Sequence, residues 1–397
     1  MSAGDSRPGP GPAARLASPD ERRWRAAGPR RSPGRLFPSG PQEALLRAAL
    51  LPVPEALHAW RAAEGWLGAG QPDPGTERLL PLVWANLTRQ GVREPGLARL
   101  AAVHEAARVH TESLLARTGP VLAALHRAGI PTLVLKGAAL VAGYYGGAGL
   151  RPMSDLDVLV PTGAATAAAA VLRAEGWIPR HRWSPRAVAL THAAAFDGAG
   201  GDTLDLHWHV FAECCRPGDD EDFWAQAVPA EVGGVPTRAL VPADQLLHVL
   251  VHGEKWVRVP GIRWVADAVH VLRSGAVDAR RLVAQTVRRR FVLRVSSQLA
   301  YLGGAIDPAL GKDLLAALAA APVSPLEWLE QALGVRERRP SNSLLAHWFT
   351  HARSARLGLA GAALSFPRYL LAIWHLEGWT GLPGAVIARA GARLRRR

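Results

Sequence analysis

The sequence predicts an α+β fold, with a small mixed sheet at the core and helical regions before and after it. Short apolar, partly β-branched segments recur between residues 130 and 211, and a helix-like segment lies among them at 162–176. On both sides of this stretch the apolar residues have helical spacing, with Pro and Gly at the breaks. Strand segments alternating with helices inside one such stretch are typical of α/β and α+β domains.

These patterns divide the chain into five parts. They are a Pro- and Arg-rich tail that we expect to be disordered (1–40), a helical region (41–128), the sheet-containing core (129–243), a second helical region (244–388) and a basic tail (389–397). Within the core the predicted strands are at 130–136, 154–161, 177–183, 188–196 and 202–211. A chain of 397 residues is long enough to bury a core of this kind.

The formal net charge is +14, a value often found in nucleic-acid-binding proteins. About ten of these charges lie in the two arginine-rich tails, so the middle of the chain is only mildly basic. The tails are either solvated or bind an anionic partner, and nucleic acid is not excluded. The N-terminus lacks the apolar segment of a secretory signal, and the only cysteines, Cys214 and Cys215, are adjacent. We therefore expect a cytoplasmic protein with no transmembrane segment.

Two aspartates lie one residue apart in the segment SDLDVLV. Side chains on a strand alternate between its faces, so Asp155 and Asp157 point the same way, with Cα atoms about 7 Å apart. Such a pair suits Mg²⁺, which takes one or two carboxylates together with substrate phosphates. A solvated, inert pair is the alternative.

A second polar strand face is predicted in TLDLHWHV. Asp205, His207 and His209 share one face there, and the residues between them are apolar. A carboxylate and two imidazoles opposite an apolar face indicate a functional surface, whereas a water-exposed sheet edge is the simpler alternative. His207 is the better candidate of the two histidines.

Together the segments LVLKGAALVAGYY, LRPMSDLDVLV and LDLHWHV resemble the uncharacterised bacterial nucleotidyltransferase family marked by LKG, R, DxD and DxHW. This family is part of the DNA polymerase beta-like nucleotidyltransferase superfamily, and the resemblance spans roughly residues 131–272. It implies a transferase that moves NMP from ATP or another NTP to an acceptor and releases pyrophosphate, with Mg²⁺ or Mn²⁺ as cofactor. The acceptor is unidentified: a small molecule, a peptide, a protein or an RNA end.

The resemblance also implies roles for individual residues. The catalytic, metal-binding carboxylates would be Asp155, Asp157 and Asp205. The nucleotide-binding residues would be Lys136, Gly137 and Arg151. At Gly137 the backbone would come close to the phosphates, which a residue without Cβ permits easily. Further residues that match the family and could line the cleft are His207, His252, Arg263 and Asp267.

Other interpretations are open to different degrees. GYYGGAG lacks the GxxxxGK[ST] pattern, so a P-loop is excluded. His248 and His252 are four apart on a predicted helix, a spacing able to hold zinc, but no third ligand is evident nearby. The chain could also be a catalytically silent nucleotide-binding or scaffold protein of the same fold. The presence of all three carboxylates favours the enzyme.

Overall fold

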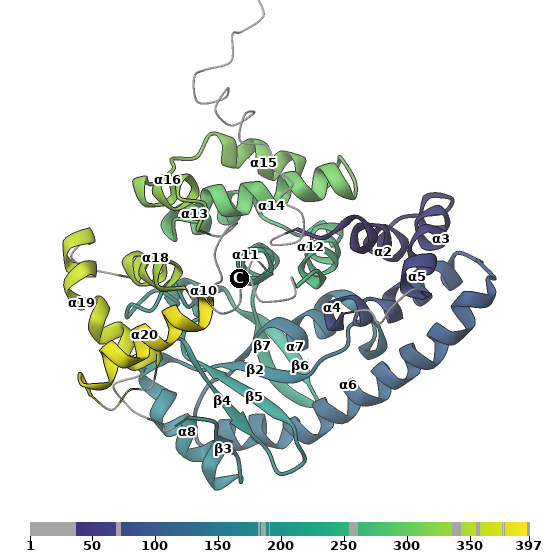
Figure 1. Cartoon of the computed structure of the whole chain (residues 1–397). Helices are drawn as coiled ribbons and strands as arrows, with labels where there is room; N and C mark the ends of the chain where they lie inside the picture. Colours follow the sequence, from purple (N-terminus) through teal and green to yellow (C-terminus); the bar gives the residue numbers. More distant parts are fainter. Residues whose placement is uncertain are drawn as a thin grey trace, which may run out of the picture.

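The computed structural model describes residues 37–394, except 69–72, 182, 184–187, 190, 254–260, 336–342, 355–357, 375 and 377. The predicted tails therefore lie outside the described residues over 1–36 and 395–397. The predicted α+β class is confirmed, because a seven-stranded mixed sheet is surrounded by helices (Figure 1).

Helices precede the sheet along the chain. They are α2 (Gly40–Leu50), α3 (Glu55–Gly68), α4 (Pro74–Glu77), α5 (Leu80–Arg89) and α6 (Pro95–Arg127). Helix α2 begins with a capping box, in which the Ser39 and Gln42 side chains satisfy backbone N–H groups of the first turn. The 33-residue helix α6 runs along the sheet (Figure 1).

The seven strands form one sheet in the order β3-β4-β5-β2-β1-β7-β6. Their bounds are β1 (Leu133–Val134), β2 (Asp155–Leu159), β3 (Ile178–Pro179), β4 (Ala193–Asp197), β5 (Thr203–His207), β6 (Val228–Val232) and β7 (Val235–Ala239). Strand β2 is parallel to β5, and β1 is parallel to β7, whereas the other neighbours are antiparallel.

Strands β1, β2, β3 and β5 lie inside predicted strand segments, and β4 ends at Asp197, one residue beyond its predicted segment of 188–196, but β6 and β7 were not predicted. Pro229 and Pro236 interrupt the apolar pattern of these two strands, and proline is depleted in strands. The signal for the hairpin is Gly233-Gly234, where both residues have positive φ, 58° and 76°. Consecutive residues with positive φ are typical of the tight turns that join antiparallel strands.

Helices and turns of the core connect the strands, and further helices follow the sheet. Those of the core are α7 (Lys136–Leu140), the π-helical turn η1 (Val141–Tyr145), the 3₁₀ turns η2 (Ala148–Leu150) and η3 (Thr162–Ala164), α8 (Ala165–Ala174) and α10 (Glu221–Gln226). Those after the sheet are α11 (Pro242–Gly253), α12 (Arg263–Arg273), α13 (Ala279–Arg288), α14 (Val292–Ala305), α15 (Lys312–Ala319), α16 (Pro325–Ala332), α18 (Leu344–Ser354), α19 (Gly358–Ile373) and α20 (Gly381–Leu394).

The two faces of the central strands differ in character. Leu156 and Val158 of β2 are fully buried in one hydrophobic cluster with Leu204 and Leu206 of β5, and residues of α6 and α8 complete it. A second cluster joins the N-terminal helices to α11, α12 and α14. The polar side chains that alternate with the leucines and valine are thus held on the opposite face by burial of the apolar ones.

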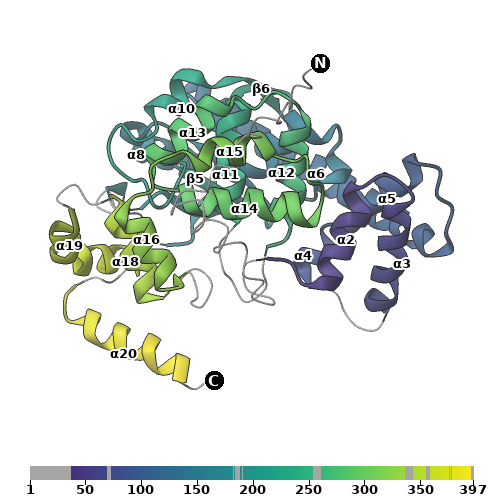
Figure 2. The ribbon, with the colours of Figure 1, turned by 90° about the horizontal axis from the view of Figure 1, so that it is seen from above.

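Figure 2 shows α2, α3 and α5 at one side of the molecule and α18, α19 and α20 at the other, with the core between them. Among the described residues, no helix combines the length and apolar character needed to cross a membrane.

Candidate active site

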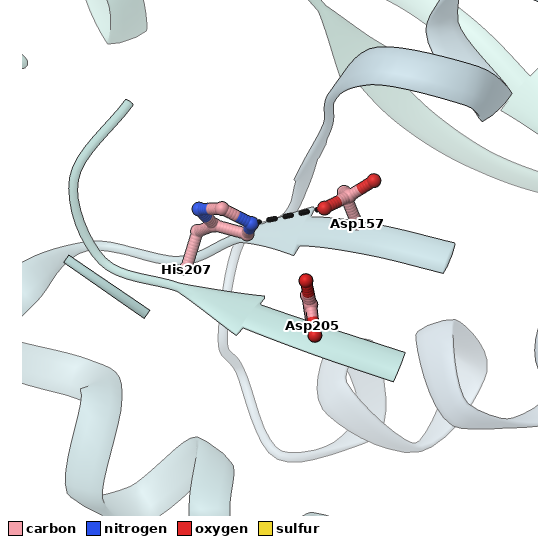
Figure 3. Close-up of side chains that lie close together, drawn as sticks. All are labelled: Asp157, Asp205 and His207. Atoms are coloured by element: carbon pink, nitrogen blue, oxygen red, sulfur yellow. Dashed lines mark hydrogen bonds and ion pairs between the residues drawn. The ribbon is translucent and has the colours of Figure 1, made fainter. Parts of the chain in front are cut away.

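The register of β2 and β5 brings the two polar strand faces side by side. The strands are parallel, and Asp157 lies directly opposite Asp205. Asp155 lies opposite Thr203, and His207 lies opposite Leu159. The carboxylates of Asp157 and Asp205 therefore come from adjacent strands and point to the same side of the sheet (Figure 3).

Asp157, Asp205 and His207 form a compact group of possible metal ligands. One ligand atom from each lies within 4.8 Å of the other two, and this is the only such group of three found in the part of the chain that the structure describes. The His207 Nε2 atom lies 3.0 Å from Asp157 Oδ1 (Figure 3). Asp157 and His207 are buried, whereas the side chain of Asp205 is 27% exposed. Solvent therefore reaches the group from the side of Asp205.

Lys136 supplies a positive charge to this group. Its Nζ donates a hydrogen bond to Asp157 Oδ1 and lies 3.8 Å from Asp205 Oδ2. Burial would lower the pKa of Lys136, but the carboxylates outweigh burial and raise it, so the ammonium stays charged. Lys136 has φ = +44°, a left-handed conformation that side chains with Cβ rarely adopt. Strained backbone of this kind concentrates at functional sites.

The ionisation states of the group follow from these contacts. Burial would raise the pKa of Asp157, but Lys136 and His207 outweigh it and hold that pKa well below its usual value. Burial and the Lys136 charge lower the pKa of His207, so the imidazole is neutral at neutral pH. A neutral imidazole facing a carboxylate must donate from Nε2. The other ring nitrogen, Nδ1, is buried and has no hydrogen-bond partner among the described residues.

Asp155 lies outside the group of three. It is half-buried at the start of β2, and its Oδ1 accepts a hydrogen bond from the Ser154 hydroxyl at 3.2 Å. Burial and the negative charge of Asp157 raise the pKa of Asp155. Three carboxylates against a single ammonium leave an excess of negative charge, which fits a divalent cation.

Comparison with known proteins places the chain in a family. The sequence model of the family described as "Uncharacterised nucleotidyltransferase" matches residues 75–302. The chain belongs to this family. No protein of curated function matches it. The match begins in α4 and ends in α14, so it includes the whole sheet and the Asp157–Asp205–His207 group.

In this member of the family, Arg151 lies in a buried ion pair with Asp267. Its Nε and Nη2 donate to the two oxygens of Asp267 at 2.7 and 2.8 Å. The Tyr145 hydroxyl also donates to Asp267, at 2.6 Å. Burial would raise the pKa of Asp267, but Arg151 outweighs it and the pKa is lowered. The bidentate pair joins the segment before β2 to helix α12.

Arg263 strengthens the same junction. Its Nη1 donates to the Pro152 carbonyl at 2.6 Å. Burial, with the Arg151 charge as the second cause, lowers the pKa of Arg263 to about 10. Arg263 and Asp267 are thus built into the junction between α12 and the β2 segment.

Gly137 packs closely against the same segment. A Cβ at this position would lie 3.0 Å from Arg151 Nη1 and 3.0 Å from Met153 Cγ, closer than ordinary van der Waals contact. The absence of a side chain therefore lets α7 approach Arg151.

The two remaining predicted histidines have different positions. His252 of α11 lines a small cavity of about 10 Å³ together with His207, His192 and His248. His209 does not share the strand face of His207, because β5 ends at His207. The His209 Nδ1 instead lies 2.5 Å from Asp220 Oδ2. The predicted strand extended too far, since the polar–apolar alternation continues past the last paired residue.

The Arg151–Asp267 pair gives a stability prediction. Asp267→Asn should lower the free energy of unfolding by about 3–5 kcal/mol, because it leaves a buried arginine without its counter-charge. Urea denaturation measures the change. The matched control is Asp197→Asn, which removes a carboxylate whose ion pair with Arg180 is about half exposed and should change the free energy of unfolding little. Equal losses for the two variants would contradict a special contribution of the buried pair.

Proposed function

We propose that this protein transfers NMP from an NTP to an acceptor, with release of pyrophosphate, in a metal-dependent reaction. The observation that carries the proposal is the Asp157–Asp205–His207 group on paired strands, in a chain of a nucleotidyltransferase family. Carboxylate ligands suit Mg²⁺ or Mn²⁺. Such an ion, when bound, neutralises charge that develops on the phosphate oxygens.

The protein's own residues have distinct tasks in this proposal. Asp157 and Asp205 would hold the cation, and His207 would join them through Nε2 in the tautomer that carries its proton on Nδ1. Asp155 lies at the start of the same strand, where it can bind a second ion or the same one. Asp205, the most exposed member of the group of three, is placed to accept the proton of an acceptor hydroxyl. The Lys136 ammonium balances the carboxylates and is close enough to contact a phosphate brought to them.

Arg151 and Gly137 contribute to the proposed reaction by holding the segment between β1 and β2 in place. The Arg151 guanidinium uses Nε and Nη2 on Asp267 and directs Nη1 toward Gly137. Both residues therefore fix the loop between β1 and β2 against α12. We infer that Arg151 acts on the nucleotide mainly by holding this loop.

One observation favours a second candidate, a catalytically silent nucleotide-binding or scaffold protein. The Lys136 ammonium is bonded to Asp157, where it takes up a carboxylate oxygen that a cation would need. If a cation cannot displace the ammonium, the fold binds nucleotide without transferring it.

A labelling experiment separates the two candidates. The purified protein is incubated with each α-³²P-labelled NTP, with Mg²⁺ or Mn²⁺ and with fractionated host lysate, which supplies the acceptor. We expect label to enter one fraction with at least one NTP, and chelation of the metal by EDTA to abolish it. If no NTP gives label and NTP binding does not depend on metal, the scaffold candidate is favoured instead.

A further inference from the structure

A cavity lined by arginines lies apart from the Asp157–Asp205–His207 group. It has a volume of about 60 Å³, and none of its lining residues belongs to that group. The lining comes from the segment after β5, the end of α13 with the turn to α14, and the last turn of α18. The lining residues are Cys214, Arg216, Asp219, Arg288, Arg289, Arg290 and Arg353.

The charges of the side chains that line this cavity do not balance. Arg288 forms an ion pair with Asp222, and Arg353 forms one with Glu330. Asp219 is the only carboxylate among the described residues of the lining. Among the described residues, neither Arg289 nor Arg290 has an ion pair with a carboxylate. The site therefore has an excess of positive charge, which favours an anion.

Two of the arginines are buried, and each has a nitrogen without a hydrogen-bond partner among the described residues. Arg289 is 5% exposed and Arg353 is 6% exposed. The Arg289 guanidinium donates to the Gln285 side chain and to the Asp219 carbonyl, but its Nε has no hydrogen-bond partner among the described residues. Arg353 Nη1 likewise has no hydrogen-bond partner in the described part of the chain. A buried N–H without an acceptor is destabilising, more so on a charged group, and an anion would supply acceptors.

Arg290 continues the arginine lining of the cavity to the protein surface. Its backbone has φ = +59° at the end of α13, where glycine is usual, and its side chain is exposed at the cavity. The carbonyl of Arg290 accepts a hydrogen bond from Arg353 Nε at 3.3 Å, so the turn is tied to the buried arginine. The exposed Arg290 is thus the member of the lining that can be changed with least effect on the core.

We propose that this arginine cavity binds a phosphate group. Planar guanidinium groups match phosphate oxygens, and Arg is preferred where such an anion is bound by several donors. One water needs about 10–15 Å³, so a cavity of about 60 Å³ has room for a phosphate group but not for a nucleotide. Burial raises the pKa of the Cys214 thiol, so the lining offers donors and no reactive thiolate. The phosphate is either a free ion or the end of a larger ligand.

Calorimetric titration of the full chain tests this site. The parent is titrated with inorganic phosphate in chloride buffer containing EDTA, and then with phosphoserine as a phosphomonoester. We expect saturable binding of inorganic phosphate, weakened at least about tenfold in Arg290→Gln, since a hydrogen bond to a charged group contributes about 1.5–3 kcal/mol. Binding of both probes supports a site for the end of a larger ligand, and binding of inorganic phosphate alone supports a free-ion site.

The control is Arg280→Gln, which removes an exposed arginine of the same helix, α13, that does not line the cavity. It should bind phosphate like the parent. Thermal unfolding gives a second measurement, because phosphate should raise the melting temperature of the parent and of Arg280→Gln more than that of Arg290→Gln. Absence of saturable phosphate binding in the parent, or equal weakening in both variants, would overturn the proposal.

Discussion

Asp157→Asn should reduce the rate of NMP transfer at least about a thousandfold, since Lewis-acid stabilisation contributes several kcal/mol and each 1.4 kcal/mol is tenfold in rate. The substitution keeps the size of the side chain and removes the charge at the centre of the group, where Asp157 contacts both Lys136 and His207. Asp205→Asn should have a comparable effect, because Asp205 lies directly opposite on β5. The measurement is the initial rate of incorporation from the labelled NTP that the parent uses.

Asp197→Asn is the matched control for both substitutions, because Asp197 lies on the neighbouring strand β4 and outside the carboxylate group. It should transfer NMP like the parent. Circular dichroism of each variant separates loss of chemistry from loss of fold. If Asp157→Asn is folded, binds Mg-NTP and transfers NMP at the parental rate, the assignment of the active site is wrong.

The sequence predicts which residues share a strand face, because the two-residue period of a strand is fixed by its geometry. SDLDVLV and TLDLHWHV could therefore be recognised as two strands, each with one polar and one apolar face. Their register could not be predicted, since it depends on how the apolar faces pack against α6 and α8. The observed register opposes Asp157 to Asp205 and leaves Asp155 opposite Thr203. This explains why His207, and not Asp155, completes the compact group.

Long-range ion pairs are the other feature that the sequence does not reveal. Arg151 was predicted to bind nucleotide because it precedes the two aspartates and resembles a family position. Its partner Asp267 is 116 positions further along the chain. Only the packing of α12 against the β2 segment brings the two together. A basic residue near a candidate site is therefore ambiguous until the carboxylates that the fold places around it are known.

Lys136→Met should have opposite effects on stability and on metal affinity. Without metal, the substitution leaves Asp157, which is 2% exposed, with no cationic partner and should lower the free energy of unfolding by about 3–5 kcal/mol. With Mn²⁺ the loss should shrink, because a cation that binds the same carboxylates no longer has to displace the ammonium. Mn²⁺ binding in the absence of nucleotide should therefore be tighter than in the parent. Unfolding in EDTA and in Mn²⁺, together with calorimetric titration of Mn²⁺, measures both effects.

Lys312→Met is the control, because Lys312 is an exposed lysine at the start of α15. It should change neither the stability in EDTA nor the Mn²⁺ affinity. If Lys136→Met binds Mn²⁺ more weakly than the parent, the lysine orients the carboxylates instead of competing with the cation. If the variant is as stable as the parent in EDTA, the ion pair with Asp157 contributes little. Because these readouts need no acceptor, they test whether the carboxylate group can exchange its own ammonium for a divalent ion, which separates an enzyme from a silent member of the family.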